Sequence, residues 1–268
     1  MYFSILRKFL DVGVDMLPPL VGGNPQIGPA DLAALTSRIH SAEALELVRE
    51  HLGGALGNGP PNPNAAVRMS KLQAAQVYAA SVMFGYFLRA VDARFQLERQ
   101  FGTLGRTPEE SVKALEALFN SAADADEQDP SRYMAPPGQS SQPPPPKASL
   151  RRYVESFDSE QLSNTARIVS AEAGALVERQ TTGLFGSVEA LQRQMIEAIG
   201  PGIDSAEAFM KATHAAIESG RVETLTLPYA SQRRVVLEAV AFGSFLRDVE
   251  GRVMGHETAL LTTRTPGM

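Results

Sequence analysis

Two blocks of this sequence occur twice, in the same order. Residues 36–48 (TSRIHSAEALELV) and 165–177 (TARIVSAEAGALV) are identical at nine of thirteen positions. Residues 84–94 (FGYFLRAVDAR) and 242–252 (FGSFLRDVEGR) are identical at seven of eleven positions. Alanine-rich helices can resemble one another by chance, but two ordered blocks with matching glycines and arginines argue against chance. We therefore expect two similar helical halves that arose by internal duplication.

The two copies differ by an insertion. The first blocks lie 129 residues apart and the second blocks lie 158 residues apart, so the second copy contains 29 additional residues. The obvious inserted material is the segment 187–219, in which the pattern predicts two amphipathic helices, at 187–199 and 205–219.

The second block predicts a long helix with one apolar face and an unusual glycine. Its apolar residues recur at helical spacing in both copies. A glycine within a helix costs about 1 kcal/mol relative to alanine, so Gly85 and Gly243 at equivalent places suggest a packing role. Each follows a small residue by one turn, Ser81 and Ala239. We expect the two long helices to cross at these glycines about a pseudo-two-fold axis.

Four charged residues lie beside this apolar face. Arg89 and Arg247 are each followed three residues later by an acid, Asp92 and Glu250. If the four are buried between the halves, they would form a charged network that fixes the register of the helices at some cost in stability. We predict this packing and ion-pair network, and the alternative is that the two arginines bind a ligand.

The remaining pattern predicts an all-α fold with at most one short strand. The strand is expected at 222–227 (VETLTL), where apolar and polar residues alternate. The segment between the halves is rich in Pro, Ser and Asp, with too few apolar side chains to offset its ordering entropy. We expect an N-terminal half, a disordered linker, a C-terminal half and a flexible tail, at 1–120, 121–149, 150–257 and 258–268. The expected helices are at 1–17, 31–56 with a break near 41, 69–101, 107–119, 149–185 with a break at 157–159, and 230–254.

Composition excludes several classes of site. The chain has no cysteine, which rules out disulfides, thiolate metal sites and cysteine nucleophiles. Its four histidines lack the spacing of a metal site within a helical bundle, and the sequence has neither a phosphate-binding glycine loop nor a nucleophile elbow. The net charge of −5, with both signs mixed, argues against nucleic acid. We therefore assign no catalytic, cofactor-binding or metal residue and favour a non-enzymatic protein.

The first seventeen residues read as an amphipathic helix. Ile5, Leu6, Phe9, Leu10 and Val14 follow helical spacing. We expect a core helix of the fold, and the alternative is peripheral contact with a membrane surface, for which two basic residues provide little charge. No apolar run approaches the ~18 residues of a transmembrane helix.

Three long stretches, which include these repeated blocks, resemble a plant and algal family catalogued as domain of unknown function 760, to which UV-B-induced chloroplast proteins belong. The stretches are 70–98 (SKLQAAQVYAASVMFGYFLRAVDARFQLE), 150–186 (LRRYVESFDSEQLSNTARIVSAEAGALVERQTTGLFG) and 233–250 (RRVVLEAVAFGSFLRDVE), and the N-terminal RKFLDVGVDMLPPL also fits.

The resemblance implies a location and a broad role. It implies a plastid protein connected with light stress, and it defines no reaction and no catalytic residue, although the first residues here lack the composition of a transit peptide. The function that we expect is a non-enzymatic plastid protein acting through protein partners. The alternative is a small-molecule binder or enzyme with a site between the two halves.

Overall fold

The computed structural model confirms a mostly helical fold. It describes residues 1–14, 20–21, 24–25, 33–57, 59, 62–105, 109–110, 112–113, 116–117, 120, 149–201 and 205–253. The helices are α1 (Tyr2–Asp11), α2 (Ala42–Leu56), α3 (Lys71–Gln100), α5 (Leu150–Glu155), α6 (Ser159–Ala166), α7 (Ala171–Phe185), α8 (Val188–Ile199), α9 (Ala206–Glu218) and α10 (Tyr229–Val253); the strands are β1 (Leu20–Val21), β2 (Asn24–Pro25), β3 (Ala66–Ser70) and β4 (Thr224–Pro228).

Each of the two longest helices, α3 and α10, follows directly on a short strand. Strand β3 precedes α3, strand β4 precedes α10, and the two strands pair antiparallel, with Val67 opposite Leu227. The strand predicted at 222–227 is thus confirmed, but the prediction of at most one strand was wrong. A lone strand leaves its backbone groups unpaired, so β4 requires a partner. Residues 66–70 supply that partner, although the helical pattern from Met69 onward concealed them.

Helices α2 and α7, which begin within the two copies of the first repeated block, are built alike. Both have fifteen residues, and the side chains of Ser41 and Ser170 accept the N–H of the third residue that follows. Both end at a glycine with positive φ, Gly57 at 67° and Gly186 at 93°, a conformation that favours glycine. The break expected near residue 41 is therefore the N-cap of α2. The duplication itself stays a prediction.

The N-terminal helix α1 packs into the core, as predicted. Ile5 and Phe9 are buried, and the Phe9 ring lies 5.3 Å from that of Phe245 on α10. The helix is shorter than predicted and ends at Asp11, because Gly13 takes a φ of 72° and turns the chain. No helix in the described part of the chain is long and apolar enough to cross a membrane.

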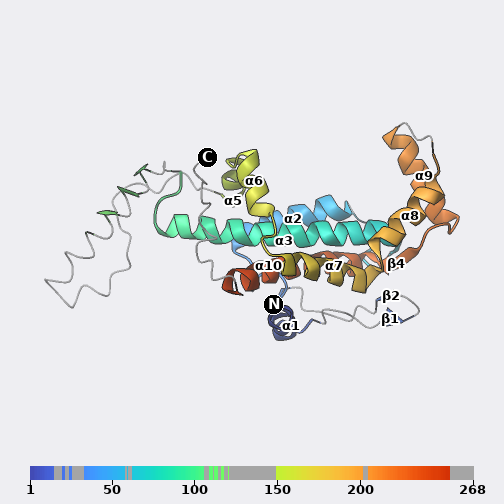
Figure 1. The fold of residues 1–268 in the computed structure, drawn as a ribbon, viewed down its shortest axis with the longest axis horizontal. Coiled ribbons are helices and arrows are strands. Elements are labelled where there is room, and N and C mark those ends of the chain that lie inside the picture. The colour runs from blue at the N-terminus through green and yellow to red at the C-terminus, as the bar shows by residue number, and fades with distance from the viewer. Residues whose placement is uncertain are drawn as a thin grey trace. The chain divides into compact units, whose positions relative to one another are not determined.

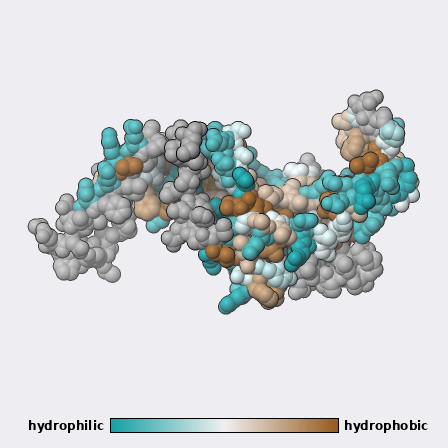
Figure 2. Space-filling view, in the orientation of Figure 1, coloured by the Kyte–Doolittle hydropathy of each residue, from teal (hydrophilic) through white to brown (hydrophobic). Residues whose placement is uncertain are grey.

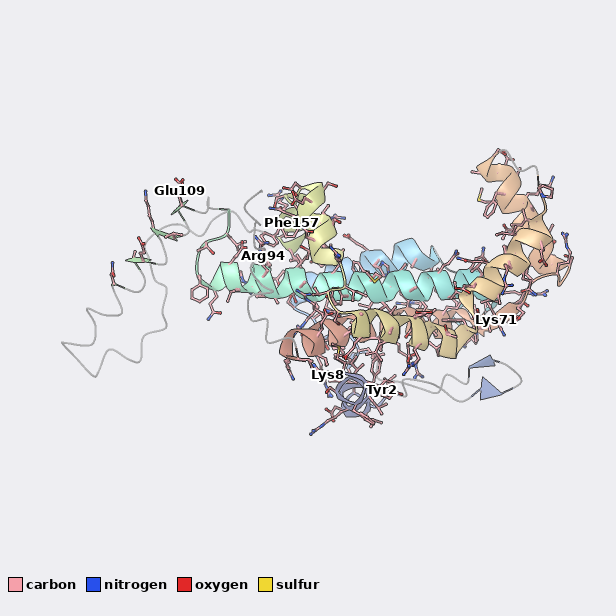
Figure 3. All side chains as sticks on the ribbon, viewed as in Figure 1. Tyr2, Lys8, Lys71, Arg94, Glu109 and Phe157 are labelled. Carbon is pink, nitrogen blue, oxygen red and sulfur yellow. The ribbon has the colours of Figure 1, made fainter. Side chains whose placement is uncertain are left out.

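The chain divides into two compact units. One comprises residues 1–90 and 158–268, and the other comprises residues 91–157. In the second unit, the C-terminal part of α3 holds α5: Tyr153 donates a hydrogen bond to Glu98 at 2.7 Å, and the guanidinium of Arg94 lies over the Phe157 ring (Figure 3). The predicted tail, 258–268, and all of the predicted linker except its last residue lie outside the described residues.

Helices α8 and α9 form a hairpin between α7 and β4. Figure 1 shows this hairpin standing away from the ends of α7 and α10. Leu191 and Met195 of α8 pack with Ala216 and Ile217 of α9 in a small core that also contains Leu72 of α3 and Val222. The corresponding connection between α2 and β3 has no helix in its described residues. The hairpin thus occupies the place of the predicted insertion, and both of its predicted helices are confirmed.

Candidate functional site

Helices α3 and α10 meet at Gly85 and Gly243. A Cβ atom added at Gly85 would lie 2.0 Å from the carbonyl oxygen of Val240, and one added at Gly243 would lie 1.9 Å from the carbonyl oxygen of Val82. Neither distance is compatible with a side chain, so backbone packs directly on backbone at both glycines. The contact is reciprocal, since each glycine faces the residue three positions before the other glycine.

Small polar side chains complete the glycine contact. Ser244 is fully buried, and its hydroxyl lies 3.1 Å from the carbonyl oxygen of Gly85 and 3.0 Å from that of Val240. Ser81, one turn before Gly85, is also fully buried and donates to the Val77 carbonyl at 2.7 Å. The crossing is therefore filled by protein atoms at the two glycines.

Arg89 pairs with an acid on the opposite helix. Its Nε donates to Asp248 Oδ1 at 2.7 Å, and its Nη1 donates to the Ile39 carbonyl at 3.1 Å. The other oxygen of Asp248 accepts from Lys8 of α1 at 3.0 Å. Burial by itself would raise the pKa of Asp248, but Arg89 and Lys8 outweigh burial and hold that pKa below its usual value. Asp248 thus ties α1 and α3 to α10.

Glu250 is a buried carboxylate with a full set of hydrogen bonds. It is 2% exposed and accepts from the Tyr86 phenol on α3, and from the backbone N–H and the hydroxyl of Ser170 at 2.7 and 2.6 Å. Arg247 donates to the Tyr86 oxygen at 2.8 Å and lies 3.8 Å from Glu250. Because Ser170 is the N-cap of α7, the carboxylate joins that cap to both long helices.

The environment of Tyr86 keeps its phenol protonated. Burial, followed by the hydrogen bond to Glu250, raises the pKa of Tyr86 to about 12, against the opposing effect of Arg247. The phenol therefore remains a donor to the carboxylate at every physiological pH. These hydrogen bonds hold the buried carboxyl group of Glu250 in one orientation, as is typical of a structural network.

The structure places the six predicted residues in four settings. Gly85 and Gly243 oppose each other's helices, Arg89 bonds to Asp248, and Arg247 and Glu250 share Tyr86. Asp92 is buried in the second compact unit and accepts from Gln96 at 3.1 Å. Among the described residues, no three His, Asp or Glu side chains are grouped so that they could hold a metal ion.

Sequence reasoning missed four members of this network, which are Lys8, Tyr86, Ser170 and Asp248. Tyr86 and Asp248 occupy positions at which the repeated blocks differ, since the other copy carries Ser244 and Ala90 there. A phenol or an acid that appears in one copy of a buried motif needs a partner. That asymmetry is the signal that would have identified both residues.

A cavity of about 320 Å³ lies next to the β3–β4 ladder. It is bounded by parts of α2, β3, α3, α7, β4 and α10, and all of its lining residues belong to the first compact unit. Its walls are mainly aliphatic and aromatic. The residues that line it are Ala55, Leu56, Val67, Met69, Gln73, Ala74, Val77, Tyr78, Phe185, Leu227, Gln232, Val235 and Val236.

The comparisons with known proteins agree with the resemblance noted above. Residues 25–101 match the profile of the family described as protein of unknown function (DUF760). A UV-B-induced chloroplast protein of Arabidopsis thaliana is 33% identical over 264 residues, which cover 94% of this chain and 58% of that protein. No solved structure matches the chain. Residues 25–101 are therefore similar to the DUF760 family, and nearly the whole chain is similar to a UV-B-induced chloroplast protein.

Proposed function

We propose that this protein is a non-enzymatic plastid protein that acts through protein partners in the response to light or UV-B stress. The plastid location and the stress role are supported by its similarity to the UV-B-induced chloroplast protein of Arabidopsis. The chain spans 58% of the length of that relative, so the role of the whole relative comes to this chain as a proposal. The filled helix crossing, which joins backbone to backbone, supports a scaffold rather than a catalyst.

The observation that carries the proposal is the outer end of the α8–α9 hairpin. Ile196, Phe209 and Met210 are 70%, 51% and 65% exposed. Apolar side chains also reach the surface of this hairpin in the space-filling view (Figure 2). Large exposed apolar side chains that gather on one projecting element are typical of interaction surfaces.

The form of α9 suggests how a partner binds. All residues from Ser205 to Lys211 are exposed, so the first turns of this helix are uncovered on every face, while Thr213, Ala216 and Ile217 are buried against α8 and the rest of the first compact unit. A helix end presented in this way fits an apolar groove on another protein, with Phe209 and Met210 as anchors. The partner is thus a protein with a groove that accepts an amphipathic helix.

Proximity labelling tests this proposal. The native full-length protein, fused to a labelling enzyme, is expressed in photosynthetic cells under UV-B light and compared with the double variant Phe209→Glu and Met210→Glu. Phe3→Glu is the matched control, because Phe3 is 82% exposed on α1. We expect a reproducible partner that disappears with the double variant and remains with the control, and that binds the purified wild-type protein directly. Identical labelled proteins for the wild type and the double variant would refute the proposal.

A further inference from the structure

We propose that the cavity beside the β3–β4 ladder binds a small, neutral, mainly apolar molecule that carries a carbonyl or hydroxyl group. This site is separate from the hairpin surface proposed above for a protein partner. It rests on three properties of the cavity: apolar walls that are only partly covered, an uncharged lining, and a volume that suits a small ligand.

The walls consist of apolar side chains that the protein itself covers only in part. Val67 and Met69 of β3 and Leu227 of β4 are half-buried and line the cavity, while the alternate residues Arg68 and Thr226 are exposed. The strand alternation therefore directs its apolar face into an unfilled space. A ligand in that space would complete the burial of these side chains.

The lining of the cavity disfavours a charged ligand. Among the described residues that line the cavity there is no Lys, Arg, His, Asp or Glu, so an ionic ligand would lose its hydration without gaining a counter-ion from them. The lining residues with polar side chains are Gln73, Gln232 and Tyr78. Tyr78 is hydrogen-bonded to Gln180, and burial raises the pKa of Tyr78 far above its usual value, so this phenol stays neutral.

The amide of Gln232 is held in place by the ladder. Its Nε2 donates to the Val67 carbonyl at 3.3 Å, which leaves the amide oxygen as an acceptor for a ligand hydroxyl. Gln73 is exposed and marks the rim of the cavity, where its amide can donate to a carbonyl. These two groups explain why the ligand needs one neutral hydrogen-bonding group and no more.

The volume fixes the size of the ligand. The cavity volume of about 320 Å³ is the volume that about ten molecules occupy in liquid water. It falls at the lower end of the volumes of known small-molecule sites. Protein interiors rarely contain voids larger than a water molecule. An α-helix ~10 Å wide does not fit, which excludes the helix of a protein partner as the occupant.

A pair of fluorescent probes tests the site in the full-length protein. N-Phenyl-1-naphthylamine is neutral and apolar, and 1-anilinonaphthalene-8-sulfonate is the same ring system with a sulfonate. We expect saturable binding of the neutral probe at one molecule per chain, and binding of the sulfonate that is at least tenfold weaker. Absence of saturable binding of the neutral probe, or equal binding of the two probes, would overturn the proposal.

Variants that fill the cavity show whether the neutral probe binds there. Ala74→Phe fills the cavity from α3, and Ala80→Phe makes the same change at an exposed position of that helix. We expect at least a tenfold loss of affinity for the neutral probe in the first variant and none in the second. If thermal melts show that Ala74→Phe is unfolded, Ala55→Leu, which projects from α2, replaces it. Unchanged affinity in a folded cavity variant would contradict the site.

The hairpin variant separates the two proposals. The double variant Phe209→Glu and Met210→Glu is expected to bind the neutral probe as the wild type does, although it loses its protein partner. Loss of the probe from this variant would place the probe on the hairpin and overturn the cavity site. Retained probe binding with unchanged partner labelling would overturn the hairpin surface alone.

Discussion

The contact between Gly85 and Gly243 allows a quantitative test of how the two long helices pack. A Cβ at Gly85 would lie 2.0 Å from the Val240 oxygen, whereas nonbonded heavy atoms prefer separations of about 3.5 Å. Alanine at either position therefore requires the helices to move apart by more than 1 Å. The obstacle is backbone on both sides, so no side-chain rotation relieves the clash.

The expected loss of stability in the alanine variants follows from two opposed effects. Overpacking costs about 1–3 kcal/mol, with the upper end appropriate where backbone must move, and the alanine regains about 1 kcal/mol of helix propensity. We expect Gly85→Ala and Gly243→Ala each to lower the free energy of unfolding by about 2 kcal/mol. In a chain of this size that corresponds to a decrease in Tm of roughly 4–8 °C.

Thermal and urea unfolding of matched variants provide the measurement. Gly251→Ala is the control, because Gly251 lies on α10 with no atom near its added Cβ and should show only the gain from helix propensity. The double variant Gly85→Ala, Gly243→Ala should lose less than the sum of the single losses, since one separation of the helices accommodates both methyl groups. If both single variants were as stable as Gly251→Ala, the close backbone contact would be refuted.

Three further predictions concern the polar network. Tyr86→Phe removes a donor from the buried Glu250 and should lower the free energy of unfolding by about 1–3 kcal/mol, measured by urea unfolding; a loss below 0.5 kcal/mol would contradict the role of the phenol. The pKa of Asp248 is lowered in the folded state, so its stabilisation is present above its unfolded value near 4 and is lost as pH falls through the folded value. Asp248→Asn should therefore weaken the pH dependence of stability below pH 4, and an unchanged acid profile would argue against the Lys8 and Arg89 pairs. Ser41→Ala removes a helix cap and should lower the free energy of unfolding by about 1 kcal/mol. Ser170→Ala should lower it further, because Glu250 also loses a donor, and urea unfolding of the two variants measures the difference. Equal losses would contradict the link between the α7 cap and the carboxylate.

Most of the helices could be predicted from the sequence because their signals are local. The serine caps of α2 and α7 and the glycines that end these helices lie within a few residues of the structure that they determine. Strand β3 was missed because its evidence is not local. Residues 66–70 are a strand because Thr224–Pro228 pair with them, and nothing in those five residues reports a partner more than 150 positions away.

The polar network was predicted only in part, for a related reason. Spacing along one helix identifies partners three or four residues apart, so it paired Arg89 with Asp92. The acid to which Arg89 donates, Asp248, lies on the other long helix. The cavity could not be predicted at all, because it depends on where side chains from six separate elements fail to fill space.

The reciprocal glycine contact has the form of an isologous interface inside one chain. In a symmetric homodimer, the same patch of surface meets itself, and any substitution appears on both sides at once. Here Gly85 faces Val240 and Gly243 faces Val82, yet the two sides belong to one polypeptide and can change independently. The two sides differ next to the glycines themselves, where one helix carries Tyr86 and the other carries Ser244. A single chain can therefore place a phenol of one helix against a buried carboxylate while a serine of the other helix bridges the two backbones. Identical subunits cannot divide these roles, because each residue would occur on both sides.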